Sequence, residues 1–140
     1  MKIHYLEPNF AVSPQIEHTD LHDIAQLGFK TIICNRPDGE HHEQPSQQQL
    51  AQLAEELGLT FIYLPLQNGQ IQQADGRQLA ATIAETELPI LAFCRSGTRS
   101  AIAWALANTA HRSAEEIRAC VEAQGYSLNS CYIEQAHTLD

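Results

Sequence analysis

The sequence predicts a single α/β domain, spanning residues 1–140, with a mostly parallel sheet of four to five strands and helices on both faces. Short apolar runs alternate with amphipathic segments along the chain, which is typical of strand–helix–strand units with right-handed crossovers. The length of 140 residues suffices for one core, and the apolar fraction of 44% is ordinary for a globular protein. No apolar run approaches the roughly eighteen residues of a membrane span.

The first half of the chain supplies strands and two helices. Residues 2–13 (KIHYLEPNFAVS) predict one or two edge strands. Residues 18–29 (HTDLHDIAQLGF) predict a helix, because their apolar side chains recur at helical spacing before Gly28. Residues 30–34 (KTIIC) predict a buried strand, residues 46–57 a second helix and residues 60–66 (TFIYLPL) a second strand.

The second half repeats this alternation. Residues 77–87 predict a third helix, 88–94 (LPILAFC) a third strand and 98–110 an apolar helix. Trp104 on that helix is expected in the core, although its Ala- and Leu-rich face could instead join two subunits of a homo-oligomer. Residues 113–125 predict an amphipathic helix with an S-x-x-E capping box from Ser113 to Glu116, and residues 129–137 a short helix.

Composition narrows the class of protein. The formal net charge of −9, with eight Lys and Arg residues, argues against nucleic-acid binding, which depends on neutralising phosphates. The first residues lack the continuous apolar segment of a secretory signal, so we expect a cytoplasmic protein that does not bind membranes. The scattered spacing of Cys34, Cys94, Cys120 and Cys131 predicts reduced thiols rather than disulfides or a paired-cysteine zinc site.

The stretch FCRSGTRS, residues 93–100, is the strongest candidate site. Cys94 ends a predicted buried strand, and a loop and a helix follow, so backbone N–H groups of the loop converge beside the sulfur. The helix dipole, Arg95 and Arg99 favour a thiolate, and Arg99 can fork onto two oxygens of an oxyanion. Gly97 permits a turn that a side chain would obstruct. The stretch therefore predicts a nucleophile facing an anion cradle, the alternative being a small buried cysteine.

The segment C-R-S-G-T-R-S resembles two families. Cysteine-dependent phosphatases of the dual-specificity and tyrosine kind have five residues between cysteine and arginine, whereas rhodanese sulfurtransferases have four, as this chain does. The order of elements over residues 10–110, with the phrases NRPDGE, PLQNGQI and AFCRSGTRS, resembles the dual-specificity layout. It is most similar to the bacterial phosphatase-like family found alone or fused ahead of metallo-β-lactamase-like hydrolases.

The resemblance implies a cysteine-phosphatase fold, a phosphate-like or sulfur-containing anionic substrate, and no cofactor. It implies that Cys94 is the nucleophile and that Arg99 clamps the oxyanion. Ser100 would donate a hydrogen bond to the sulfur. The loop amides would come from Ser96, Gly97 and Thr98. From their positions after two strand ends, and not from the resemblance, we also expect Arg95 and Arg36 to contact the substrate.

Three departures from the phosphatase pattern leave the reaction open. The loop is one residue short, and Phe93 stands where phosphatases usually have a histidine. Gln67 and Asn68 follow the second strand, and neither side chain can act as a general acid. Asp75 could be that acid or cap the third helix. We expect a phosphoester hydrolase first, a sulfurtransferase using a Cys94 persulfide second, and an anion-binding regulatory module without turnover third.

Other polar residues have two interpretations each. Arg36 could reach the same anion or pair locally with Asp38 or Glu40. Cys34 could be a resolving thiol, but a small buried residue is the simpler expectation. His18 and His22, four residues apart, and the run 41–43 (HHE) invite a metal interpretation. The sequence lacks H-E-x-x-H, and a solvated polar loop is the default, so no metal is expected.

Overall fold

The computed structural model describes residues 1–128 and contains one five-stranded sheet in the order β1-β2-β5-β3-β4. The strands are β1 (His4–Glu7), β2 (Phe10–Ser13), β3 (Thr31–Cys34), β4 (Thr60–Tyr63) and β5 (Ile90–Phe93). All neighbours are parallel except β1, which runs antiparallel to β2. The predicted mostly parallel sheet is confirmed, and the N-terminal segment supplies two strands, of which β1 lies at the edge.

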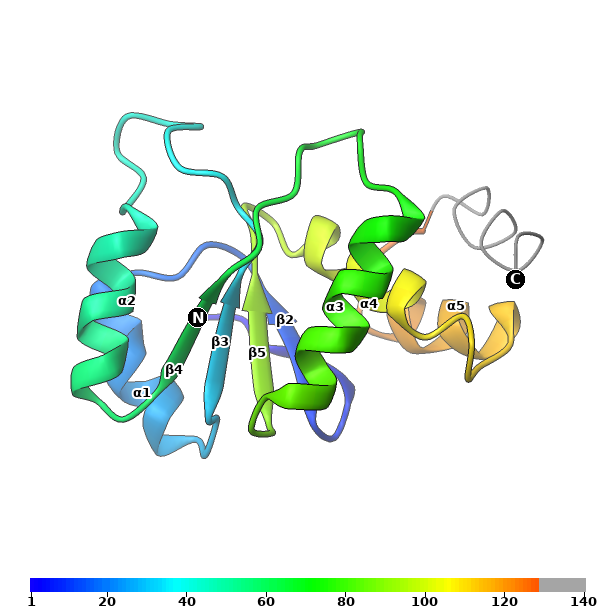
Figure 1. Cartoon of the computed structure of the whole chain (residues 1–140), viewed down its shortest axis with the longest axis horizontal. Coiled ribbons are helices and arrows are strands. Elements are labelled where there is room, and N and C mark those ends of the chain that lie inside the picture. The colour runs from blue at the N-terminus through cyan, green and yellow to red at the C-terminus, as the bar shows by residue number, and fades with distance from the viewer. Residues whose placement is uncertain (129–140) are drawn as a thin grey trace.

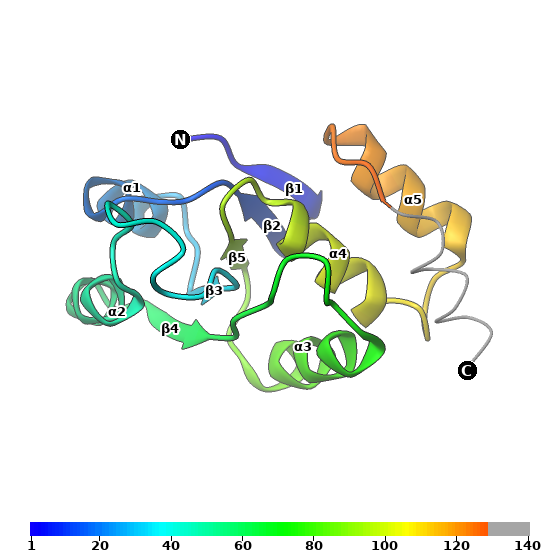
Figure 2. The same ribbon diagram turned by 90° about the horizontal axis from the view of Figure 1, so that it is seen from above.

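Helices cover both faces of the sheet (Figures 1 and 2). One face carries the short 3-10 helix η1 (His18–Asp20), α1 (Leu21–Gln26) and α2 (Gln47–Glu56), and the other carries α3 (Gln73–Glu85), α4 (Thr98–Ala107) and α5 (Ala114–Ala123). The Ser46 and Ser113 side chains cap α2 and α5 by accepting N–H groups three residues on, each at 3.2 Å. The predicted three-layer arrangement is therefore present.

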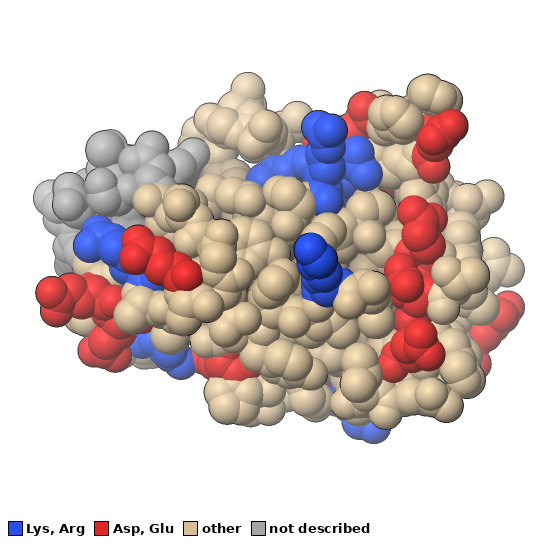
Figure 3. Space-filling model, turned by 180° about the vertical axis from the view of Figure 1, so that it is seen from behind, with Lys and Arg blue, Asp and Glu red and all other residues tan. Residues whose placement is uncertain are grey.

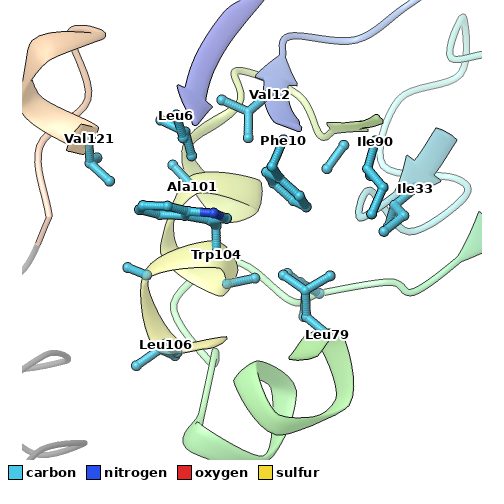
Figure 4. Close-up of a cluster of buried hydrophobic side chains, with 14 of the residues drawn as sticks. Leu6, Phe10, Val12, Ile33, Leu79, Ile90, Ala101, Trp104, Leu106 and Val121 are labelled. Carbon is cyan, nitrogen blue, oxygen red and sulfur yellow. The ribbon is translucent and has the colours of Figure 1, made fainter. Parts of the chain in front are cut away.

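Two apolar cores flank the sheet, and the larger one surrounds Trp104. Figure 4 shows Trp104 on α4 among Leu6 from β1, Phe10 from β2, Leu79 from α3 and Val121 from α5. The Trp104 side chain has no solvent exposure. The expectation that this residue belongs to the core is confirmed, and α4 is thereby fixed directly behind the loop that precedes it.

We expect Trp104→Ala to lower the free energy of unfolding by about 3–5 kcal/mol, because a large buried aromatic side chain leaves a cavity that its neighbours only partly fill. Urea unfolding followed by circular dichroism measures this loss. Leu27→Ala is the matched control, since the Leu27 side chain is 58% exposed and its truncation should cost little. Equal losses in the two variants would contradict the packing described here.

Several predicted boundaries are wrong, among them the end of the apolar helix predicted over 98–110, which the structure ends at Ala107, and one predicted helix lies outside the described residues. The third helix begins at Gln73, four residues before the predicted start, because Gln72 and Asp75 form a reciprocal capping box. The second strand ends at Tyr63 instead of residue 66. The predicted helix at 129–137 falls beyond residue 128. Within residues 1–128, no helix is long and apolar enough to cross a membrane.

Candidate active site

The candidate site lies at the carboxyl ends of β2, β3 and β5, where the loops after these parallel strands meet. A pocket of about 630 Å³ opens there. It is lined by polar side chains from four loops and the first turn of α4, together with one proline: Gln15, Glu17, Arg36, Glu40, His41, Glu43, Gln44, Pro45, Asn68, Arg95 and Arg99. The two arginine-bearing junctions predicted from the sequence therefore share one pocket.

Cys94 lies directly after β5 at the base of the loop, with no solvent exposure in this conformation. The Gly97 backbone N–H donates to Cys94 Sγ at 3.1 Å. Gly97 adopts a positive φ of 96° immediately before α4 begins at Thr98, a conformation that favours glycine. The sulfur thus sits against the N-terminus of α4, where orphan N–H groups and the helix dipole favour negative charge.

The serines on either side of Gly97 have structural partners. Ser96 Oγ contacts Thr98 Oγ1 at 3.1 Å and accepts the Thr98 N–H at 3.4 Å, which closes the turn into α4. Ser100 Oγ donates to Asn35 Oδ1 at 2.8 Å. The expected hydrogen bond from Ser100 to the sulfur is therefore replaced, because a serine hydroxyl carries one hydrogen and the structure directs it to Asn35.

Asn35 ties three elements together beneath the loop. Besides accepting from Ser100, its Nδ2 donates to the Leu64 carbonyl after β4 at 2.9 Å. Its backbone N–H donates to the Phe93 carbonyl at 2.8 Å. Asn35 is 2% exposed, so these bonds replace water in a dry site. The start of α4, and with it the nucleophile loop, is fixed to the sheet.

Both buried arginines bind one carboxylate, that of Glu40, a residue at the surface of the molecule. Arg99 Nη1 and Nη2 contact Glu40 Oε2 and Oε1, both at 2.8 Å, and Arg99 Nη1 also donates to the Leu66 carbonyl at 2.9 Å. Arg36 Nε donates to Glu40 Oε1 at 2.9 Å and its Nη1 to Gln15 Oε1 at 3.0 Å. Of the partners expected for Arg36 locally, Glu40 is the one it takes, although Arg36 is buried rather than on the surface.

This ion pair changes what Arg99 can offer. The hydrogen bond from Arg99, with help from Arg36, holds the pKa of Glu40 below its usual range, and Glu40 in turn raises the pKa of Arg99. The two terminal nitrogens of Arg99 therefore already bind both oxygens of the Glu40 carboxylate. An incoming anion has to bind the other N–H groups of Arg99 or displace the Glu40 carboxylate.

We expect Glu40→Gln to destabilise the fold by about 1–2 kcal/mol at neutral pH, because two buried guanidinium groups lose a charged partner that is itself screened by solvent. Since the folded-state pKa of Glu40 is depressed, the stabilisation is present above the unfolded carboxyl pKa and is lost as the pH falls through the folded value. Urea unfolding at about pH 7 and about pH 3 measures this effect. The difference in the free energy of unfolding between Glu40→Gln and wild type should be smaller at the lower pH.

Glu43→Gln provides the control for this comparison. Glu43 lies in the same loop, is 78% exposed and has no bond to Arg36 or Arg99 among the described contacts. This variant should unfold like wild type at both pH values. A Glu40→Gln protein as stable as Glu43→Gln at neutral pH would contradict the description of Glu40 as the shared partner.

Basic side chains are otherwise sparse, and Figure 3 shows a group of them at the upper edge of the molecule, the edge at which the strands end in Figure 1. Acidic side chains run down the neighbouring flank, on the side covered by α1 and α2 (Figure 3). Arg95 is exposed and lines the pocket. The pocket lining carries three arginines and three glutamates, so its formal charges balance, and Arg95 is the arginine there that the Glu40 carboxylate does not bind.

Asp75 has a structural role at the start of α3. Its Oδ2 accepts the Gln72 N–H at 2.8 Å, at the third position of the helix rather than at the N-cap that the sequence suggested. Asp75 does not line the pocket, whereas Asn68 does. The carboxylate that the sequence offered as a general acid is thus committed to capping α3 in this structure.

Cys34 and the histidines differ from Cys94 in their surroundings. The Cys34 thiol is 3% exposed and donates to the Arg36 carbonyl at 3.4 Å, and burial raises its pKa to about 12. It is therefore a neutral buried thiol in this conformation. His41 and His42 stack on each other in the exposed loop. No group of three or more potential metal ligands occurs within the part of the chain that the structure describes.

Sequence reasoning missed three residues at the site. Glu40 was expected only as a possible partner of Arg36, and its bond to Arg99 was not foreseen. Asn35 appeared merely as a strand end. Tyr126, whose hydroxyl donates to the Ser96 carbonyl at 3.2 Å, had no signal at all because it follows α5, 30 positions from its partner.

The chain matches the family model described as "Beta-lactamase hydrolase-like protein, phosphatase-like domain" over residues 2–111. It is 32% identical over 130 residues to the beta-lactamase hydrolase-like protein of Xylella fastidiosa (strain Temecula1), which covers 91% of this chain and 30% of that protein. The corresponding protein of Agrobacterium fabrum is 33% identical over 100 residues, covering 71% and 23%. The chain therefore spans less than a third of the length of these relatives.

Solved structures support the same assignment. A Neisseria meningitidis Z2491 protein described as a candidate phosphatase superposes with a TM-score of 0.86 at 36% identity, covering 100% of this chain and 99% of that one. Tk-PTP in its active form gives a TM-score of 0.76 at 14% identity, covering 98% and 94%. P. aeruginosa TpbA, in a complex with phosphotyrosine, gives a TM-score of 0.68 at 12% sequence identity, and the match covers 98% of this chain and 88% of that one. The two more distant likenesses concern the fold. The resemblance inferred from the sequence is confirmed, and the chain belongs to the phosphatase-like domain family of beta-lactamase hydrolase-like proteins.

Proposed function

We propose that this domain is a cysteine-dependent hydrolase of phosphoesters with Cys94 as its nucleophile. The observation that supports it best is the position of Cys94 Sγ, which accepts the Gly97 N–H at the N-terminus of α4 beside the Arg99 guanidinium. A thiolate is stabilised by such donors, and they also suit the oxygens of a phosphoryl group. The relatives described as phosphatases, and the phosphotyrosine held by TpbA, agree with a phosphate-like substrate.

The proposed reaction has two displacements at phosphorus. Cys94 Sγ forms a bond to phosphorus while the bond to the ester oxygen breaks, and the departing oxygen takes a proton from water. Water then attacks the phosphocysteine, releasing inorganic phosphate and restoring the thiol. Arg99, Arg95 and the loop amides of residues 96–98 would hold the phosphoryl oxygens. Because Asp75 caps α3, we expect good leaving groups, such as aryl oxides, to react best.

Sulfur transfer is a second candidate, and one observation favours it. Four residues separate Cys94 from Arg99, as in rhodaneses, and a sulfite or thiolate leaving group needs no general acid. In this reaction Cys94 would take one sulfur atom from thiosulfate, releasing sulfite, and pass it to a thiol or cyanide acceptor. Both candidates use the same nucleophile and the same anion cradle.

One set of assays separates the candidates. Purified protein is offered an aryl phosphate and, separately, thiosulfate with cyanide. Phosphate release that is lost in Cys94→Ser supports hydrolysis, whereas cyanide-dependent thiocyanate formation without phosphate release overturns it in favour of sulfur transfer. Phosphate binding without either product would leave an anion-binding module. Insertion of one glycine between Cys94 and Arg99 should raise phosphatase activity if the short loop limits it.

A further inference from the structure

Tyr126 joins the nucleophile loop from a distant part of the chain. It follows α5 and lies outside the residues that the family model matches. Its hydroxyl donates to the Ser96 carbonyl at 3.2 Å. The bond therefore ends on the backbone of the loop, two residues after Cys94.

The peptide unit that Tyr126 holds is the one that faces the sulfur. The Ser96 carbonyl and the Gly97 N–H belong to the same trans peptide, so they lie in one plane and point in opposite directions. The carbonyl end accepts from Tyr126, while the N–H end donates to Cys94 Sγ at 3.1 Å. Fixing one end of a planar unit fixes the direction of the other end.

The contact between Tyr126 and Gly97 is too close for any other residue at position 97. A Cβ on Gly97 would lie 2.2 Å from the Tyr126 hydroxyl oxygen and 2.8 Å from Cζ, and the φ of 96° disfavours side chains independently. The phenol thus packs directly on the loop backbone. Glycine at this position serves both the turn and the approach of the tyrosine.

Tyr126 is itself held in place. Its backbone N–H donates to the Val121 carbonyl at 3.2 Å at the end of α5, and its ring meets His4 of β1 edge-to-face at 5.4 Å. Burial, and then the negative charge of Cys94, raise the pKa of Tyr126, so the phenol remains a protonated donor at neutral pH.

We propose that Tyr126 is a positioning residue, whose hydroxyl locks the peptide between Ser96 and Gly97 with its N–H aimed at the Cys94 sulfur. The proposal rests on the proposed role of Cys94 as nucleophile. Without the lock this peptide can rotate, and the thiolate loses a donor. Tyr126, which lies beyond the residues that the family model matches, thereby supports the nucleophile loop.

Tyr126→Phe tests the hydroxyl while keeping the ring. The rate of Cys94 alkylation by iodoacetamide, located by peptide mass spectrometry, should fall roughly 3- to 10-fold, the value of one hydrogen bond. Tyr5→Phe is the matched control, because Tyr5 stacks on Phe29 and is 45% exposed away from the site. It should react like wild type. An unchanged alkylation rate in Tyr126→Phe would overturn the proposal.

A second measurement separates positioning from general stability. Hydrogen exchange of the Gly97 amide, measured by NMR at a temperature at which both variants are folded, should speed up in Tyr126→Phe relative to other amides of α4. Uniform loss of protection across α4 would indicate a structural role and overturn the proposal. The exchange measurement does not require turnover. An unreactive Cys94 in the wild-type protein would contradict the proposed function. The exchange rate of the Gly97 amide would still test the role of Tyr126 in that case.

Discussion

Cys94→Ser is expected to lower hydrolysis of an aryl phosphate by at least about 10³-fold, because a serine hydroxyl in this loop is a far weaker nucleophile than a thiolate. The substitution removes no packing of consequence, since serine is slightly smaller than cysteine. We therefore expect the variant to fold and to retain anion binding. Steady-state kinetics and isothermal titration with inorganic phosphate measure these two properties separately.

The other cysteines provide the control for this result. Cys34→Ser and Cys120→Ser should keep most of the activity, because Cys34 is a buried neutral thiol and Cys120 lies on α5. Serine at position 34 retains a donor for the Arg36 carbonyl. Activity that survives in Cys94→Ser and disappears in Cys34→Ser would contradict the assignment of the nucleophile.

Arg99→Lys is expected to reduce kcat/KM by about 10²–10³-fold, the loss typical of one oriented donor to a developing oxyanion. Lysine keeps the positive charge but cannot fork, so it cannot hold Glu40 and the Leu66 carbonyl while facing the nucleophile loop. Its effect therefore separates geometry from charge. Kinetics with an aryl phosphate, together with thermal melts, measure it.

Arg77→Lys is the matched control, because Arg77 lies exposed on α3 outside the pocket. It should leave kcat/KM and the melting temperature unchanged. If Arg99→Lys retains activity within about threefold of wild type, positive charge alone suffices, and the forked geometry is not part of catalysis.

The strand–helix order was predictable because each element carries its own local pattern. The N-terminal segment is a case in which the local pattern does not predict the position of a strand in the sheet. The sequence predicts one or two edge strands for residues 2–13. In the structure all four residues of β2 are buried, and β2 lies inside the sheet, paired with β5. A strand buried on both faces loses its polar alternation, so its place in the sheet depends on a distant partner. The start of α3 was missed because the capping signal precedes the apolar pattern.

The nucleophile loop was predictable for a similar reason, since Cys94, Gly97 and Arg99 lie within six positions. Its partners were not. Glu40 is 59 positions from Arg99, and Asn35 is 65 positions from Ser100. Such pairs depend on which strand ends meet in the folded sheet, and no local pattern encodes them. The binding of the Arg99 guanidinium by the Glu40 carboxylate follows only from the folded structure.

The central claim is that Cys94 attacks the substrate, and covalent trapping tests it most directly. The protein is mixed with an aryl phosphate, quenched in acid within milliseconds, digested and analysed by mass spectrometry. We predict a phosphoryl group on the Cys94 peptide that is absent from Cys94→Ser. Phosphate release with no adduct on Cys94, or an adduct on Cys34 or Cys120 instead, would contradict the claim.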